Sequence, residues 1–304
     1  MSQETLSRAT TPAASSSSAT GHQSQHRHFS LAGTLGSAII YVILTIGAVI
    51  MAAPFLWMVL TSLKNNAQAF SVPPSWIPNP VQWSNYPASL SAMPFGQAYF
   101  NSAYIALTVV VCQLLTCSMA GYAFARIRFP GRDTLFIVFL ATLMIPFQLT
   151  LIPLFLIMRD LDWIDNHLSL IVPAALFSAF GVFLMRQFIK GIPPELEEAA
   201  LVDGANRWVV FWRVIFPLLR APLAALGIFA FIGQWNNFIY PLIMLNSPNL
   251  FTVPMLLNEF RGEYATQWTL TMAGSVIAVL PILIVYIIMQ RQIIQGIATT
   301  GLKA

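Results

Sequence analysis

The stretch GTLGSAIIYVILTIGAVIMAAPFLWMVLTSL, residues 33–63, contains no charged side chain and ends just before Lys64. About 20 consecutive apolar residues suffice for a helix to cross the hydrocarbon core of a bilayer, so this stretch is long enough for one span. The whole chain has the same character, because 57% of its residues are hydrophobic, only 9% are charged and its mean hydropathy is +0.70. That leaves too little polar surface to cover a soluble globule. The composition therefore predicts an all-α, multispanning membrane protein.

Further uncharged runs follow along the chain, separated by short clusters of charge. They predict six transmembrane helices, near residues 36–60, 102–125, 135–158, 168–188, 222–245 and 270–290. A charged side chain at a helix centre costs about 2.5–3.5 kcal/mol on insertion scales. Every Lys, Arg, Asp and Glu lies at or beyond the end of a predicted span. Residues 71–94 contain six prolines and predict an ordered loop ahead of the second span.

The basic residues predict the orientation. If both termini are cytoplasmic, twelve of the fifteen Lys and Arg residues lie inside, and only Lys64, Arg159 and Arg261 lie outside. Residues 1–30 are rich in Ser, Thr, Gln and His and predict a disordered cytoplasmic tail before a transmembrane domain over residues 31–304. A signal peptide is the alternative for this end, but its apolar core would be only about 7–15 residues long.

A cytoplasmic loop over residues 193–217 is predicted between the fourth and fifth spans. Its segment PELEEAALVDGANRWVVFW, residues 194–212, contains four acidic residues. Pro194 suits the first turn of a helix, where acidic side chains face the positive end of the helix dipole. Gly204 suits the left-handed residue that ends such a helix. A second helix is predicted from about Asn206.

This predicted loop has two interpretations, an anchor on the lipid surface or a docking site for a protein. Leu196, Ala199 and Ala200 share one face of its first helix at the i, i+3, i+4 spacing. That apolar face is small, and amphipathic helices often lie at interfaces as anchors. The acidic residues would be repelled by the negatively charged inner leaflet, which favours a protein partner.

Catalytic and metal-binding motifs are not found in the sequence. HExxH, GxSxG and GxxxxGK[ST] are all missing. The three histidines of the predicted tail have no fixed geometry for a metal. Cys112 and Cys117 point to different faces of a helix, so we expect free thiols there and no disulfide or metal pair. We therefore expect neither an enzyme nor a metal site, and nothing indicates binding to nucleic acid.

The loop resembles the EAA loop of permeases from binding-protein-dependent ABC importers. The match consists of Glu198-Ala199-Ala200, three residues, Gly204, nine residues, and then Val214-Ile215-Phe216-Pro217. Val214 and Phe216 replace the usual Ile and Leu. Residues 85–106, 121–131, 144–154, 234–242 and 296–303 are similar to the shorter membrane subunit of maltose- and glycerol-phosphate-type sugar importers. The resemblance covers about residues 35–304.

This resemblance implies a function and a set of partners. The chain would be a non-catalytic permease subunit in the bacterial inner membrane, translocating a sugar or sugar-like solute delivered by an extracytoplasmic binding protein. It would pair with a second permease subunit and with two ATP-binding subunits, which hold ATP and Mg²⁺, while the chain itself binds no cofactor. The predicted coupling helix would dock on an ATP-binding subunit through Glu198, Ala199, Ala200 and Gly204, with Leu196 and Asp203 beside them. The C-terminal residues Gly301, Leu302 and Lys303 would contact the same subunits.

Polar residues within the predicted spans are candidates for a sugar pathway. They are Gln148, Gln234, Asn236 and Asn237, with Trp235 available to stack on a sugar ring. The alternative is that these amides bond neighbouring helices together.

Two other functions are alternatives to the importer. An ion-coupled secondary transporter would require ionisable residues within the membrane and often shows inverted repeats, and the sequence shows neither. A membrane scaffold would require neither the Gly204 turn nor a row of amides.

Overall fold

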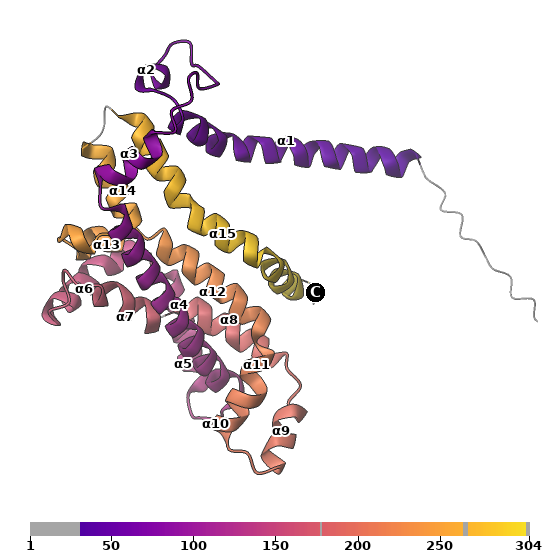
Figure 1. Ribbon diagram of the computed structural model, residues 1–304. Helices are drawn as coiled ribbons and strands as arrows, with labels where there is room; N and C mark the ends of the chain where they lie inside the picture. The colour runs from indigo at the N-terminus through magenta and orange to yellow at the C-terminus, as the bar shows by residue number, and fades with distance from the viewer. Residues whose placement is uncertain (1–30, 177, 264–266, 302–304) are drawn as a thin grey trace, which may run out of the picture. The chain divides into compact units, whose positions relative to one another are not determined.

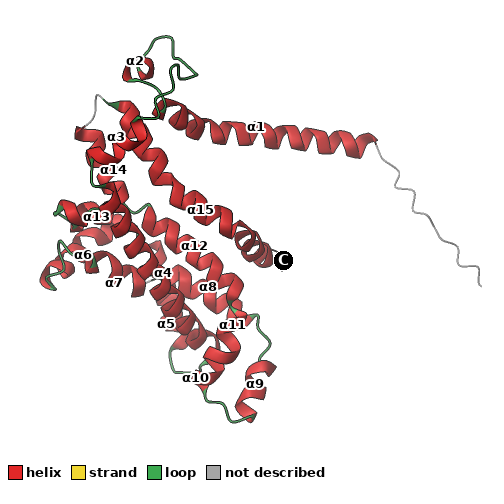
Figure 2. Cartoon of the chain, viewed as in Figure 1, coloured by secondary structure: helices red, strands yellow, loops and turns green. Residues whose placement is uncertain are grey.

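The computed structural model describes residues 31–176, 178–263 and 267–301, and in this part of the chain all regular secondary structure is helical, with loops between the helices (Figures 1 and 2). The predicted N-terminal tail, Leu302 and Lys303 lie outside the described residues. The helices are α1 (Leu31–Ser62), α2 (Asn66–Ala69), α3 (Asn85–Ala92), α4 (Phe95–Arg126), α5 (Arg132–Ala141), α6 (Phe147–Asp160), α7 (Leu168–Leu176), α8 (Ala179–Lys190), α9 (Glu195–Val202), α10 (Arg207–Val210), α11 (Phe216–Leu218), α12 (Arg220–Trp235), α13 (Ile239–Met244), α14 (Val253–Glu263) and α15 (Trp268–Gly301), with 3₁₀ turns η1 (Thr142–Met144) and η3 (Pro248–Leu250) and a π-helical turn η2 (Phe211–Ile215).

Four helical segments among the described residues are long and apolar enough to cross a membrane. They are Ala38–Ser62, Phe95–Arg126, Leu168–Lys190 and Trp268–Gln290. Two bent pairs raise the number of candidate spans to six if each pair is one span: Arg132–Met144 with Phe147–Asp160, bent by 104°, and Arg207–Leu218 with Arg220–Trp235, bent by 77°. The protein is therefore an all-helical membrane protein with four to six candidate spans.

The bend between α5 and α6 differs from the continuous helix expected over residues 135–158. Ile145 adopts an extended backbone, with φ −82° and ψ 117°, and Pro146 precedes α6. Proline disfavours the helical conformation in the residue before it, which accounts for the break. The expected span over residues 222–245 is likewise divided, because α12 ends at Trp235 and α13 begins at Ile239. α4 begins at Phe95, earlier than the expected residue 102.

The described residues divide into two compact units, the first ending at Ala53 and the second beginning at Pro54. In the second unit α4 is the central helix and contacts α7, α8, α12 and α14 (Figure 1). Polar side chains of α4 donate hydrogen bonds to backbone carbonyls of α7. Gln113 Nε2 donates to the Ala174 carbonyl at 2.6 Å, and Thr116 Oγ1 donates to the Ala175 carbonyl at 2.9 Å. Hydrogen bonds of this kind hold helices together within a bilayer.

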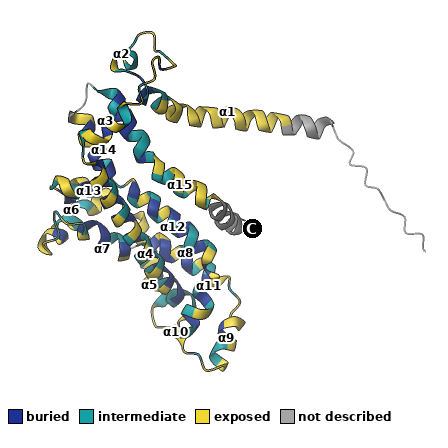
Figure 3. Cartoon of the chain, in the orientation of Figure 1, coloured by how far each residue is buried: buried dark blue, intermediate teal, exposed yellow. Residues whose placement is uncertain are grey.

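A buried cluster at one end of α4 joins that helix to the segment that follows α9 (Figure 3). Its members come from α4, α5, α8, α10, η2 and α12 and include Tyr122, Met185, Val210, Phe211 and Ile215. Each of these side chains is at most 4% exposed. This cluster positions the loop that contains α9.

The close packing of α4 on α8 depends on Gly121. A Cβ atom added there would lie 2.6 Å from Met185 Cβ and 2.9 Å from the backbone nitrogen of Arg186, whereas one added at Gly96 in the same helix would have nothing within 4 Å. We predict that Gly121→Ala lowers the free energy of unfolding by about 1–3 kcal/mol, because α8 must move away. The midpoint of thermal unfolding of the detergent-solubilised chain measures this. Gly96→Ala, the same change in the same helix, should leave the midpoint unchanged or raise it slightly, because alanine favours a helix more than glycine does. An equal fall in both variants would contradict the packing argument.

Candidate functional site

The loop between α8 and α12 contains the helix that the sequence predicts. α9 begins at Glu195, directly after Pro194, and the amides of Glu197 and Glu198 donate to the Pro194 carbonyl at 3.0 and 3.1 Å. Three acidic residues, Glu195, Glu197 and Glu198, occupy the first turn. Negative charge is favourable there because it faces the positive end of the helix dipole.

A tight turn ends α9 and starts α10. Gly204 has φ +88°, in the left-handed region where glycine is favoured, and its amide donates to the Leu201 carbonyl at 3.1 Å. The next amide, of Ala205, donates to the Ala200 carbonyl at 3.0 Å. Asn206 then caps α10, because its side chain accepts a hydrogen bond from the Val209 amide at 2.9 Å. The helix, turn and helix are thus held by local bonds.

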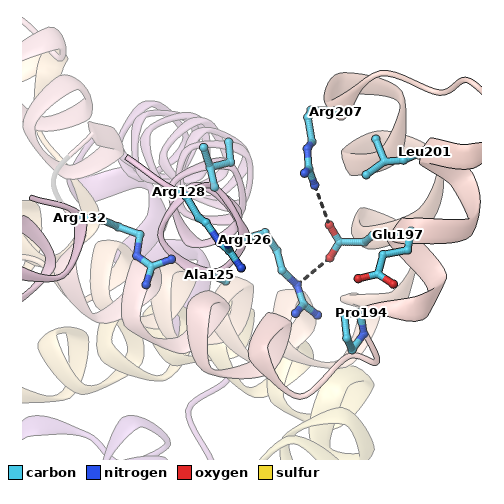
Figure 4. A pocket seen from close by; sticks show the side chains of 10 residues that line it. Ala125, Arg126, Arg128, Arg132, Pro194, Glu197, Leu201 and Arg207 are labelled. Atoms are coloured by element: carbon cyan, nitrogen blue, oxygen red, sulfur yellow. Dashed lines mark ion pairs between the residues drawn. The ribbon is translucent and has the colours of Figure 1, made fainter. Parts of the chain in front are cut away.

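Glu197 is the buried acidic residue of α9 and anchors that helix to the rest of the second unit. Its exposure is 3%, and its carboxylate lies 2.6 Å from Arg126 Nε and 3.8 Å from Arg207 Nη1 (Figure 4). The Tyr122 hydroxyl donates to its Oε2 at 3.2 Å. Two ion pairs and a hydrogen bond therefore compensate the buried charge, as burial of a carboxylate requires.

Arg126, the last residue of α4, connects three helices. Its Nε forms the ion pair with Glu197, a close contact not aligned as a hydrogen bond. Its Nη2 donates to the Ile189 carbonyl at 2.9 Å and to the Ile192 carbonyl, at and just beyond the end of α8. Its guanidinium thus contacts α9 and the last carbonyls of α8 together, which the planar fork of arginine allows.

The other side of α9 faces outward. Leu196 is 46% exposed, Val202 is 87% exposed, and Glu198 and Ala199 are exposed as well. Ala200 is half-buried and packs against the cluster at the end of α4. The predicted common face of Leu196, Ala199 and Ala200 is therefore divided in the structure, since Ala200 turns inward and the other two remain accessible.

A cleft of about 720 Å³ lies between α9 and the turn that follows α4 (Figure 4). It is lined by Ala125, Arg126, Ile127, Arg128, Arg132, Pro194, Glu197, Glu198, Leu201 and Arg207. Glu198, on the wall formed by α9, has no ion pair among the described residues, and its carboxylate is free to meet a partner.

The five residues predicted for a sugar pathway lie on α6 and at the end of α12. Gln148 and Asn236 are exposed, and Gln234 is half-buried. Asn237 Oδ1 accepts a hydrogen bond from the Tyr240 amide at 3.4 Å, and Tyr240 belongs to α13, which contacts α6. The polar residues thus belong to neighbouring elements.

Trp235 has a different environment from the one expected. It is 3% exposed, its Nε1 donates to the Ala278 carbonyl at 3.2 Å, and it packs against Phe231 and Tyr99. In this structure the indole is therefore closed to a sugar ring.

Gly301 is the last residue of α15, and the two residues predicted to act with it lie outside the described residues. Among the side chains that the structure describes, no group of three His, Cys, Asp or Glu could hold a metal ion. The sequence does not indicate the roles of Tyr122, Arg126, Glu197 and Arg207, which only the structure shows. The only signal was a basic residue at a span end and an acidic loop on the same side of the membrane.

Comparison with known proteins agrees with the resemblance in the sequence. The family described as binding-protein-dependent transport system inner membrane component matches residues 117–299. The arabinooligosaccharides transport system permease protein AraQ of Halalkalibacterium halodurans is 34% identical, over 88% of this chain and 98% of the relative. The lactose transport system permease protein LacG of Rhizobium radiobacter is 32% identical, over 84% and 93%. A crystallised bacterial ABC transporter for import of the acidic polysaccharide alginate has a chain with a TM-score of 0.76 and 25% identity, over 86% and 98%.

The left-handed turn at Gly204 can be tested by two substitutions. No atom lies within 4 Å of a Cβ placed there, so any penalty comes from the backbone conformation alone. We predict that Gly204→Ala destabilises the loop by about 1 kcal/mol and that Gly204→Asn costs less, because asparagine tolerates this conformation better. Thermal unfolding followed by tryptophan fluorescence, to which Trp208 and Trp212 contribute, measures both. If both variants had the wild-type midpoint, the turn would not depend on the positive φ.

Proposed function

Because this chain belongs to the family of binding-protein-dependent transport system inner membrane components, we propose that α9 docks on an ATP-binding subunit and transmits its movement to the spans. The chain is the permease component of a binding-protein-dependent sugar importer. The observation that supports α9 as the docking element is its two-sided character. One side is anchored through Glu197, and the other presents Leu196, Glu198 and Ala199 to the surroundings.

Each feature of α9 suits a partner that approaches closely. Ala199 and the glycine turn leave the backbone accessible, and the exposed Glu198 carboxylate offers charge to a basic side chain or an amide. Asp203, at the end of the helix, adds a second exposed carboxylate. ATP-driven closure of the partner subunits would move α9, and the spans would tilt between outward and inward access.

The arrangement in the membrane follows from charge and length. With each bent pair counted as one span there are six, and both termini lie in the cytoplasm with most of the Lys and Arg residues. α9 and its cleft then lie on the cytoplasmic side, where ATP and Mg²⁺ are available to the ATP-binding subunits. With six spans the end of α15, at Gly301, would lie on the same side and would contact these subunits as well.

The complete importer would contain a second permease subunit, two ATP-binding subunits and an extracytoplasmic binding protein. Relatives named for transport of arabinooligosaccharides, lactose and sn-glycerol-3-phosphate support a sugar or sugar-like solute as the substrate. The exposed Gln148 and Asn236, with Gln234 and Asn237, could provide hydrogen bonds along the route. Trp235 would take part only after its indole leaves the contacts with Phe231 and Ala278.

The docking role of α9 is tested by copurification. We predict that the tagged wild-type chain, solubilised gently, brings down an ATP-binding subunit, and that Glu198→Lys combined with Gly204→Asp does not. The first change reverses the docking charge, and the second places a side chain at the positive-φ turn. Mass spectrometry identifies the copurifying proteins. Asp160→Lys, an exposed acidic residue far along the chain from α9, is the control for charge reversal and should retain the subunit.

Two results would contradict the proposal. Retention of the ATP-binding subunit by the inserted double variant would exclude α9 as its docking site. A folded wild-type chain that brings down no ATP-binding subunit would instead favour the alternative, an ion-coupled secondary transporter.

A further inference from the structure

We propose that Glu197 and Arg126 form a latch that makes α9 move as one rigid body with α4 and α8, so that Glu197 is a positioning residue for coupling. The inference rests on the proposed docking of α9. It assigns the anchoring of the helix to one acidic residue, Glu197, and its recognition by the partner to another, Glu198.

The two adjacent acidic residues are placed in opposite environments. The Glu197 side chain is 4% exposed and paired with two arginines, whereas Glu198 is exposed and has no ion pair among the described residues. A side chain buried in this way cannot meet a partner subunit without leaving its arginines. Glu197 therefore contributes to the internal connection of α9 rather than to its outer surface.

Covalent connections alone would leave α9 free to pivot. It is joined to α8 by Gly191, Ile192 and Pro193 and the N-capping Pro194, and to α10 by the turn at Gly204. Short surface segments of this kind are commonly mobile. If a partner displaced α9, the loop alone would then move and the spans would not follow, unless a further contact connected α9 to them.

Arg126 supplies that contact. It holds the Glu197 carboxylate with one part of its guanidinium and the carbonyls of Ile189 and Ile192 with another. Because Arg126 is itself the last residue of α4, a displacement of α9 reaches the ends of α4 and α8 together. Tyr122, one turn earlier in α4, donates to the same carboxylate and packs against Phe211, with ring centroids 5.4 Å apart. Thus α4 contacts both α9, through Glu197, and the π-helical turn η2, through Phe211.

The test measures the rigidity of α9 relative to α8 in the assembled transporter. Cysteines at Val202 on α9 and Gln187 on α8, both exposed, receive spin labels after Cys112→Ser and Cys117→Ala remove the native thiols. Because Val202 lies on the outward side of α9, the doubly labelled chain is measured in the complex that it still forms with the ATP-binding subunit. Pulsed electron paramagnetic resonance then gives the distribution of distances between the two labels. It is recorded with and without Mg²⁺ and the non-hydrolysable ATP analogue AMP-PNP. We expect a narrow distribution that the nucleotide leaves unchanged, since both labels move with one body.

Glu197→Gln should release the latch while leaving docking intact. The distribution should broaden about twofold, as in an unanchored surface loop, and its mean should shift on addition of AMP-PNP. The ATP-binding subunit should still copurify, because Glu198 is unchanged. The matched control is Glu195→Gln, which should behave as wild type. It is the same substitution at an exposed acidic residue of α9, one that has no ion pair in the described part of the chain.

Arg126→Lys provides a second variant that keeps the positive charge. Lysine cannot hold the carboxylate and both carbonyls with one planar fork, so the distribution should broaden here as well. A purely structural role for Glu197 would lower the yield of assembled complex but leave the distance distribution of the folded fraction narrow. If Glu197→Gln or Arg126→Lys keeps a narrow distribution that the nucleotide does not change, the latch is overturned. If the wild-type chain brings down no ATP-binding subunit, the proposed docking is overturned and the latch with it.

Discussion

A carboxylate that is 3% exposed must be compensated by charge and hydrogen bonds, and the compensation of Glu197 determines where α9 lies. Arg126, Arg207 and Tyr122 provide it from α4 and α10. Loss of one partner from a buried pair typically costs about 3–5 kcal/mol, because the remaining charge stays buried. The loop proposed to dock on an ATP-binding subunit is thus held by an interaction that tolerates few substitutions.

Aromatic packing supports the same loop from the other side. Trp208, Phe211, Trp212 and Phe216 follow each other through α10, the π-helical turn and α11, with ring centroids 4.9–6.4 Å apart. π-helical turns occur frequently at functional sites. Here the turn places Phe211 and Ile215 in the buried cluster at the end of α4. α9 is therefore connected to the spans by an ion pair on one side and by an aromatic cluster on the other.

Close contact between α4 and α8 is what allows one arginine to serve both helices. Gly121 and Gly181 leave room for the neighbouring helix, as a Cβ at Gly181 would lie 2.6 Å from Cys117 Sγ. Small residues at helix interfaces are typical of membrane proteins, where van der Waals packing replaces the hydrophobic effect. The ends of α4 and α8 consequently lie near enough for Arg126 to reach the last carbonyls of α8.

The sequence by itself determined the class of the protein, most of its helices, and the helix, turn and helix of the loop. Uncharged runs are long enough for spans because burial of charge in a bilayer is costly, and Gly204 marks its turn because left-handed backbone favours glycine. These are local properties of the chain. Only the tertiary structure decided that Glu197 rather than Glu198 is buried and that Trp235 is enclosed by Phe231 and Tyr99. Glu197 and Arg126 are distant in sequence, and which of several acidic residues meets which arginine depends on the rotation and packing of whole helices, which no local pattern of residues specifies.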